Sequence, residues 1–172
     1  MDLEQNKEWR KTEQYLAPEK KVNNERAYDA YPSFPLGKNK IKAGIAEFAT
    51  WIEQHKTVTI DGYVGVFWQH LIENLGNELE KRAKRVRWYH VHAAMKSSDE
   101  LDEMLKPYLG GNDSLFGKIT DKNLIDWFET EKLTQIKPDT SADINIIVGC
   151  GAALAQWQAP IVYFDLPKNE LQ

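Results

Sequence analysis

A short apolar run that passes at once into a glycine-bearing turn and an amphipathic helix most constrains how this chain can fold. The run is 57–61 and the turn is 62–65. The helix that follows repeats apolar residues at three- and four-residue steps, namely Trp68, Leu71, Ile72, Leu75 and Leu79. In α/β proteins, a strand, turn and helix in this order offer a phosphate group the backbone N–H donors of a helix N-terminus. The pattern therefore predicts an α/β fold with a ligand site at this turn.

The turn lacks the side chains that a phosphate loop normally adds. Such a loop runs Gly-x-x-x-x-Gly-Lys-Ser/Thr, where the lysine contacts phosphate and the hydroxyl holds magnesium. Here the corresponding places hold Val66, Phe67, Trp68 and Gln69. The backbone pattern of a phosphate loop is present, but its charged chemistry is missing.

Three further apolar runs predict the remaining strands, at 86–91, 144–148 and 161–165. Helical patterns separate them, and the runs are continuously apolar rather than strictly alternating, which is typical of a parallel sheet buried on both faces. We therefore predict a three-layer α/β domain with about four parallel strands and helices on both faces.

The helices and the domain limits follow from the same pattern. Residues 1–40 read as an arm that lies on a domain spanning 41–172, and we expect that domain to be truncated at its C-terminal end. Helices are predicted from Ile41 to about His55, after Thr120, and over 152–156. Ser97 and Glu100 form a capping box that begins a further helix.

Composition excludes several classes of function. The formal net charge of −4 gives no reason to expect nucleic acid or a membrane as a partner. A single cysteine, Cys150, excludes an internal disulfide framework, and the N-terminus has no secretory signal, so we expect a cytoplasmic protein. Five basic residues between Lys81 and Arg87 are either a solvated helix C-terminus or a phosphate-binding patch.

The order of these segments resembles the P-loop kinases of small molecules, in particular the uridine kinase and phosphoribulokinase group. The segments VTIDGYVGVFW and IIVGCGAALAQWQAPIVYFDLPKNELQ also resemble the kinase-like regions that accompany some bacterial class I mannose-6-phosphate isomerase proteins. The resemblance implies a P-loop NTPase-like fold, with the strands in the order 2-3-1-4. This order places the turns at 62–65 and 149–151 on the same edge of the sheet. The resemblance also implies that the chain is accessory to sugar-phosphate metabolism rather than an isomerase itself.

The departures from the kinase pattern argue against phosphoryl transfer. The loop lysine and hydroxyl are absent, Val148-Gly149-Cys150 replaces the acidic turn expected after the third strand, and His90 stands where a carboxylate is common. Losing these charges removes much of the electrostatic stabilisation that such a reaction needs. We therefore expect no catalytic residues and no metal site, with ATP and magnesium as cofactors only if the chain is an active kinase.

Seven residues are the candidates for ligand binding: Asp61, Gly62, Tyr63, Gly65, His90, Gly149 and Gly151. Asp61 stands at a strand end, where open parallel sheets bind ligands, but it can equally cap the following turn. The glycines can serve tight turns as well as anion binding. His90 shares a strand face with His92 and is a candidate general base.

Three functions remain open on these residues. The first is a non-catalytic, degenerate kinase-like domain that binds a phosphorylated metabolite or a protein partner. The second is an active small-molecule kinase that uses Asp61 and the basic run at 81–87. The third is a structural or assembly domain whose sheet edge is covered by the remainder of a longer chain or by a second copy.

Overall fold

The computed structural model describes residues 36–112 and 116–166, and the account below concerns the unit that begins at Ala43. The arm predicted for 1–40 lies almost entirely outside the described residues. Pro167, which follows the last predicted strand and is expected to end it, also lies outside the described residues.

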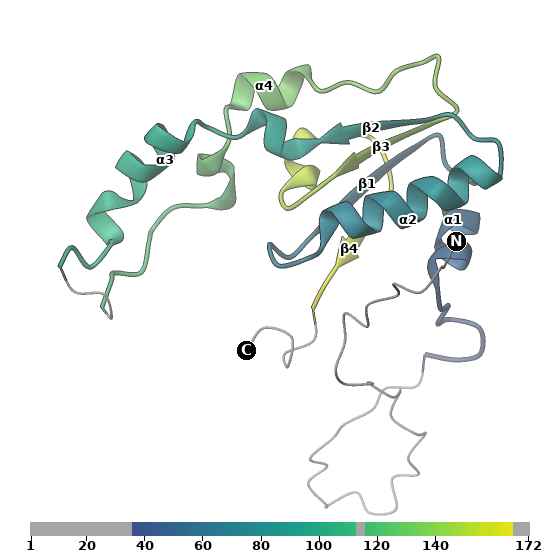
Figure 1. Cartoon of the computed structure of the whole chain (residues 1–172), viewed down its shortest axis with the longest axis horizontal. Helices are drawn as coiled ribbons and strands as arrows, with labels where there is room; N and C mark the ends of the chain where they lie inside the picture. Colours follow the sequence, from purple (N-terminus) through teal and green to yellow (C-terminus); the bar gives the residue numbers. More distant parts are fainter. Residues whose placement is uncertain (1–35, 113–115, 167–172) are drawn as a thin grey trace, which may run out of the picture. The chain divides into compact units, whose positions relative to one another are not determined.

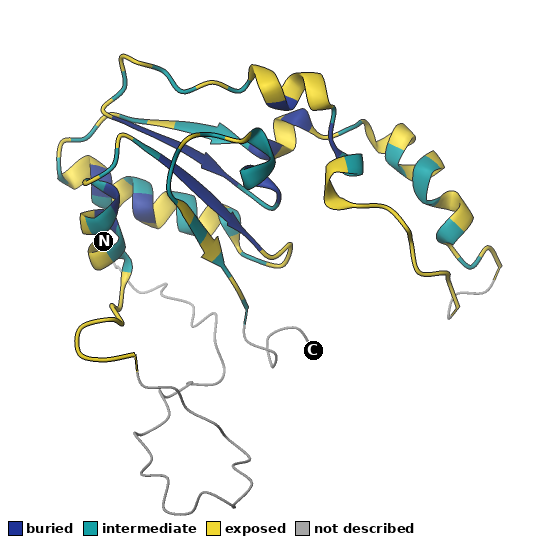
Figure 2. Ribbon diagram, turned by 180° about the vertical axis from the view of Figure 1, so that it is seen from behind, coloured by how far each residue is buried: buried dark blue, intermediate teal, exposed yellow. Residues whose placement is uncertain are grey.

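Four parallel strands form one sheet in the order β2-β3-β1-β4, which confirms the predicted fold class and strand order. The strands are β1 (Thr57–Gly62), β2 (Val86–His90), β3 (Ile144–Val148) and β4 (Ile161–Phe164). The central pair, β1 and β3, is almost wholly buried, and it forms the dark blue centre of the sheet in Figure 2. The C-terminal ends of all four strands therefore lie at the same end of the sheet. This end, which we call the edge, carries the glycine turns 62–65 and 149–151 that the sequence singled out.

Two helices cover one face of the sheet. These are α1 (Ile45–Ile52) and α2 (Trp68–Lys81), which lie next to each other in Figure 1. The buried residues of this layer are Ala49, Ile52, Val58, Ile60, Leu75, Leu79, Ile144, Ile146 and Val148. The apolar stripe predicted for α2 is confirmed, because its five residues all belong to or pack against this core.

Shorter elements cover the opposite face. They are η1 (Val91–Ala94), α4 (Thr130–Gln135) and η4 (Ala152–Ala155), of which η1 and η4 are 3-10 turns. Their core consists of Val91, Ala94, Phe128, Leu133, Ile147 and Ala152. The predicted helices on both faces are thus present, with the longer ones on the face that carries α1 and α2.

A segment that we call the excursion, residues 96–127, leaves this second layer and returns to it. It contains α3 (Ser98–Leu105), η2 (Lys106–Tyr108) and η3 (Leu124–Trp127). An antiparallel bridge between Met95 and Phe128 closes its base. Lys96 N donates to Trp127 O at 3.0 Å beside this bridge. The capping box that was predicted at the start of α3 is confirmed, with both Ser97 and Glu100 making their expected bonds.

Three details of the sequence prediction were wrong. Thr120 does not cap a helix, because Asn123 and Asp126 make the capping box of η3 while the Thr120 hydroxyl accepts from Lys122 N. Ile41 lies before α1 and is exposed. β2 ends at His90, so His92 lies in η1 rather than on the strand.

Candidate functional site

The carboxylate of Asp61 joins the ends of the two central strands. Its Oδ1 accepts from Gly62 N at 2.6 Å and from Gly151 N at 2.9 Å, and its Oδ2 accepts from Ala153 N at 2.9 Å. Asp61 is 8% exposed. We call this set of three hydrogen bonds the Asp61 clamp.

The clamp lies where a doubly wound sheet normally binds its ligand. The chain leaves β1 through α2 toward β2 on one side, whereas it leaves β3 through η4 toward β4 on the other. In open α/β sheets, the ligand crevice opens at the point where the connections diverge in this way. Here that point lies between β1 and β3, and the Asp61 carboxylate bonds across it.

The glycine turn after β3 directs most of its donors into the protein. Gly149 N donates to Ile60 O at 3.1 Å and Ala152 N donates to Gly149 O at 3.0 Å. With the two bonds to Asp61, four of the five N–H groups from Gly149 to Ala153 are used within the chain. Both glycines are required by their backbone, because φ is 125° at Gly149 and 88° at Gly151.

The two glycines after β1 have a different reason to be glycine. A Cβ on Gly62 would lie 2.3 Å from Phe164 O, so the backbone of β4 can approach only because no side chain is present. A Cβ on Gly65 would lie 3.0 Å from Leu166 Cδ1. Neither residue has a positive φ. Tyr63 N donates to Phe164 O at 2.9 Å, while the Tyr63 side chain is exposed.

His90 lies at the same edge of the sheet but pairs with Val148 of β3, on the side away from β1. The rings of His90 and His92 are 5.3 Å apart between centroids, although only His90 lies on a strand. Burial, and then the charge of His92, lowers the pKa of His90. Burial, and then the charge of Asp61, raises the pKa of the Cys150 thiol, so a thiolate is disfavoured there. The seven candidate residues thus lie at the same end of the sheet. Among them, the Asp61 side chain is hydrogen-bonded to Gly62 and Gly151.

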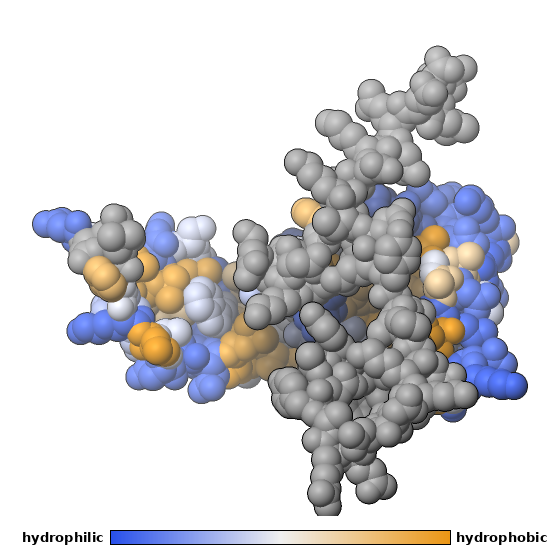
Figure 3. All heavy atoms as spheres, turned by 90° about the horizontal axis from the view of Figure 1, so that it is seen from below, coloured by the Kyte–Doolittle hydropathy of each residue, from blue (hydrophilic) through white to orange (hydrophobic). Residues whose placement is uncertain are grey.

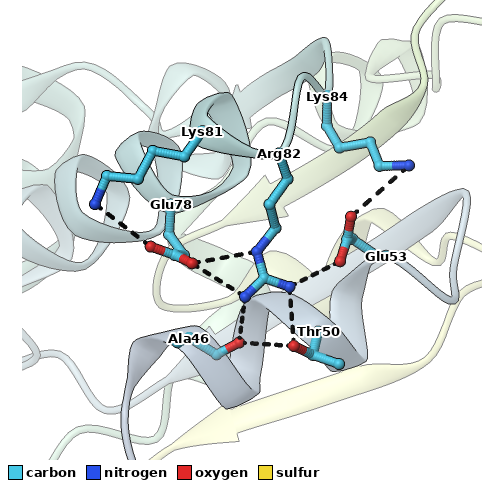
Figure 4. A network of polar contacts seen from close by, with 7 residues as sticks. All are labelled: Ala46, Thr50, Glu53, Glu78, Lys81, Arg82 and Lys84. Carbon is cyan, nitrogen blue, oxygen red and sulfur yellow. Dashed lines mark hydrogen bonds and ion pairs between the residues drawn. The ribbon is translucent and has the colours of Figure 1, made fainter.

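The basic run at the end of α2 is largely paired with carboxylates. Figure 4 shows the Arg82 guanidinium between Glu53, at 2.8 Å, and Glu78, at 3.0 Å. Lys81 contacts Glu78 and Lys84 contacts Glu53, while Arg85 pairs with Asp143 at 3.2 Å. Four of the five basic residues therefore serve ion pairs, and Arg82 ties α2 to α1. This arrangement favours the structural alternative over a phosphate-binding patch.

Comparison with known protein families gives one match, which spans residues 44–172 and is described as "Domain of unknown function (DUF8485)". The chain belongs to this family. No curated protein and no solved structure matches the chain. The match to DUF8485 covers the whole described sheet with both helical layers, and it names no kinase family.

A surface hollow that sequence reasoning missed lies beside the end of β2 in this DUF8485 domain. Its volume is about 310 Å³, and it is lined by Tyr89, Ala93, Ala94, Lys132, Gln135, Ile136 and Lys137. None of the seven candidate residues lines it. The only sequence signal was the short polar segment that forms α4, and its apolar pattern was too brief to predict a helix.

Within residues 36–112 and 116–166, no helix is long and apolar enough to cross a membrane. No three His, Cys, Asp or Glu side chains in the same ranges are grouped so that they could hold a metal ion.

Proposed function

We propose that this chain is a non-catalytic, kinase-like α/β domain that assembles with a second copy of itself. The observation that carries the proposal is the excursion, where the helix α3 has no fully buried residue and its apolar residues Leu101, Met104 and Leu105 are only half-buried. The Asp61 clamp supports the absence of phosphoryl transfer, and the kinase-like sequence resemblance supports an accessory role in sugar-phosphate metabolism.

Phosphoryl transfer needs free charged groups at the strand ends. A kinase of the resembled group would use a loop lysine against the phosphoryl group and acidic or hydroxyl side chains to hold magnesium. In this chain both oxygens of Asp61 already accept backbone N–H bonds, and the basic run is held in ion pairs. Asp61 and Arg82, which a kinase could use to bind phosphate or magnesium, therefore make structural contacts within the chain.

The excursion leaves apolar surface without a partner in the described chain. Among its large apolar side chains, Leu109 is 65% exposed, Phe116 is 73% exposed and Ile119 is 98% exposed. The helix α3 has eight residues, none of them buried, and helices of this length are marginal in water without tertiary packing. In Figure 2 the helix carries no dark blue, and at the left of Figure 3 orange hydrophobic surface lies between blue hydrophilic residues. Such a surface is typical of a protein interface.

The charges on the excursion favour a second copy as the partner. The helix α3 presents Asp99 and Asp102, while Glu103 pairs with Lys106 at 3.2 Å. The returning segment presents Lys118 next to the exposed Ile119, and its other lysine, Lys122, pairs with Asp121. In a two-fold symmetric dimer, the helix α3 of one copy can contact the returning segment of the second copy, and the same contact is repeated with the two copies exchanged. The acidic helix of one excursion can then face the basic returning segment of the other, with apolar side chains between them.

Sedimentation velocity over a concentration series tests this proposal. The wild-type chain is expected to sediment as a dimer at high micromolar concentration. The double substitution Phe116→Ser with Ile119→Glu places a charge and a polar group in the contact, so it is expected to give a monomer. Because both side chains are exposed, far-UV circular dichroism and the melting temperature should stay close to wild type.

A matched control comes from the other exposed apolar surface. Ile161 on β4 is 59% exposed, and Ile161→Ser should leave the dimer intact. A wild-type chain that stays monomeric at the highest concentration would contradict the proposal. Dissociation by Ile161→Ser, with the double variant still dimeric, would overturn it in favour of pairing through the β4 edge.

A further inference from the structure

The hollow beside β2 combines an apolar floor with a cationic rim. Its floor is Ala94, which is 1% exposed, together with the partly buried Tyr89 and Ile136. Its rim is formed by the exposed Lys132 and Lys137, with the amide of Gln135 between them in sequence. No carboxylate side chain is among the residues that line it. A ligand that matches must therefore present an apolar body to the floor and negative charge to the rim.

The two lysines differ in how far their charge is already balanced. Lys132 Nζ lies 2.7 Å from Glu129 Oε1, one turn before it on the chain. Lys137 has no carboxylate partner among the residues that the structure describes. The charge of Lys132 also acts on Glu100, so the uncompensated positive charge of the rim is that of Lys137. Most lysines on a protein surface are simply solvated. Here both lysines line a hollow that also has an apolar floor, and small-molecule sites commonly combine apolar lining with a few polar groups in this way.

We propose that this hollow binds a small organic phosphate monoester. A monoester carries a charge of about −1.5 to −2 at neutral pH, which suits the free ammonium of Lys137 and a second bond from Lys132, whose ammonium is shared with Glu129. It also supplies several acceptors for these groups and for the Gln135 amide. The volume of about 310 Å³ is at the lower end of the range for ligand pockets, so the ligand is a compact molecule. Its carbon body packs on Tyr89 and Ile136.

The site is separate from the glycine turns and from the excursion contact. The Asp61 clamp lies between β1 and β3, whereas the hollow lies along the outer strand β2 under α4. Binding in the hollow requires neither magnesium nor a second copy. The inference therefore stands or falls independently of the proposed dimer.

The test is an amide NMR titration of the full chain with phenyl phosphate as the probe. Benzoate, inorganic phosphate and benzyl alcohol serve as comparison compounds. The proposal predicts saturable shift changes at Ala93, Ala94 and Lys137, with phenyl phosphate bound about tenfold more tightly than inorganic phosphate or benzyl alcohol. Benzoate, which carries one charge, should bind more weakly than phenyl phosphate.

Two variants locate the binding. Lys132→Glu combined with Lys137→Glu should weaken phenyl phosphate binding at least about tenfold. Ala93→Trp, a change at an exposed rim position, should fill the hollow and abolish binding. The matched charge control is Lys81→Glu, at a side chain that is 74% exposed at the end of α2, and it should leave the affinity unchanged.

Three results would overturn the inference. One is an absence of saturable shifts at the residues of the hollow. Another is shift changes centred on 62–65 and 149–151 in place of the hollow. The third is an affinity for phenyl phosphate that the double lysine variant and Ala93→Trp both leave unchanged while their melting temperatures show that they are folded.

Discussion

Asp61 Oδ1 accepts a hydrogen bond from Gly151 N across 90 residues of sequence, at 2.9 Å. This bond joins the ends of the two central strands, and the second oxygen extends the connection to Ala153 N. A buried carboxylate that lost these donors would remain poorly solvated, which is costly. The side chain that the sequence marks as a ligand-binding candidate is therefore a structural tie between β1 and η4.

Replacing the carboxylate of Asp61 by an amide should destabilise the fold. Asp61→Asn removes the negative charge and replaces one of the two acceptor oxygens by an NH2 group. This NH2 group then faces a backbone N–H group, and two donors cannot form a hydrogen bond with each other. Hydrogen bonds to charged groups contribute roughly 1.5–3 kcal/mol each, so we expect a loss of about 2–4 kcal/mol. Urea unfolding, followed by circular dichroism, measures it.

Asp165 provides the control for this change. Its Oδ1 accepts only from the N–H of the next residue, Leu166, and the side chain is exposed. Asp165→Asn should therefore change the free energy of unfolding by less than about 0.5 kcal/mol. Equal effects of the two substitutions would contradict a structural role for the clamp.

Gly62 should be intolerant of any side chain. Gly62→Ala places a Cβ against Phe164 O, and because that atom is backbone, β4 must shift away from β1. We expect a loss of about 2–3 kcal/mol in urea unfolding. The contrasting change is Gly76→Ala inside α2, where the nearest atom, Trp88 Cζ2, is 3.9 Å away. That substitution should stabilise the chain by up to about 1 kcal/mol, and a stabilising Gly62→Ala would refute the packing argument.

The single cysteine should react slowly with thiol reagents. Burial, and then the charge of Asp61, raises the pKa of Cys150, so less thiolate is present at a given pH. The rate of modification by dithiobisnitrobenzoate should be below that of glutathione at pH 8, and its pH midpoint should lie above the usual value of about 8.5. A rate equal to that of glutathione would show an exposed, unperturbed thiol.

His90 should make the fold less stable in mild acid. Because burial and His92 lower its pKa in the folded chain, the unfolded chain binds a proton more readily. The contribution of His90 is fully present above about pH 6.5 and is lost as the pH falls through the lowered folded pKa. Proton NMR should place the His90 midpoint below 6.5, and His92→Ala should move it part of the way up. Urea unfolding of His90→Gln should depend less on pH between about 6.5 and 5 than that of wild type. A His90 midpoint at or above 6.5 would contradict the expected environment.

The sheet was predictable because its strands carry long apolar runs. β3, for example, is buried at all five positions, and its sequence is almost wholly apolar. The strand order followed from the resemblance, and the shared edge of the two glycine turns followed from that order. Where the pattern was short, prediction failed: the four-residue turn η3 was mistaken for a helix capped by Thr120, and α4 was missed.

The candidate residues were brought to one edge of the sheet as predicted, but their interactions were not predictable from spacing. Asp61 was expected either to bind a ligand or to cap its own turn, whereas two of its three bonds reach a turn 90 residues away. The sequence of Gly62 indicates a tight turn, but its constraint is the approach of β4. Such contacts depend on the tertiary register between strands, which local patterns do not specify.

The central claim is that the Asp61 clamp leaves no nucleotide-binding site at the ends of β1 and β3. Isothermal titration calorimetry with ATP in the presence of magnesium tests it most directly. We expect no saturable heat for the wild-type chain. Asp61→Asn, under conditions where it is folded, should give none either. Saturable binding that requires magnesium and is lost in Asp61→Asn would show a working nucleotide site at the strand ends, and it would contradict the account.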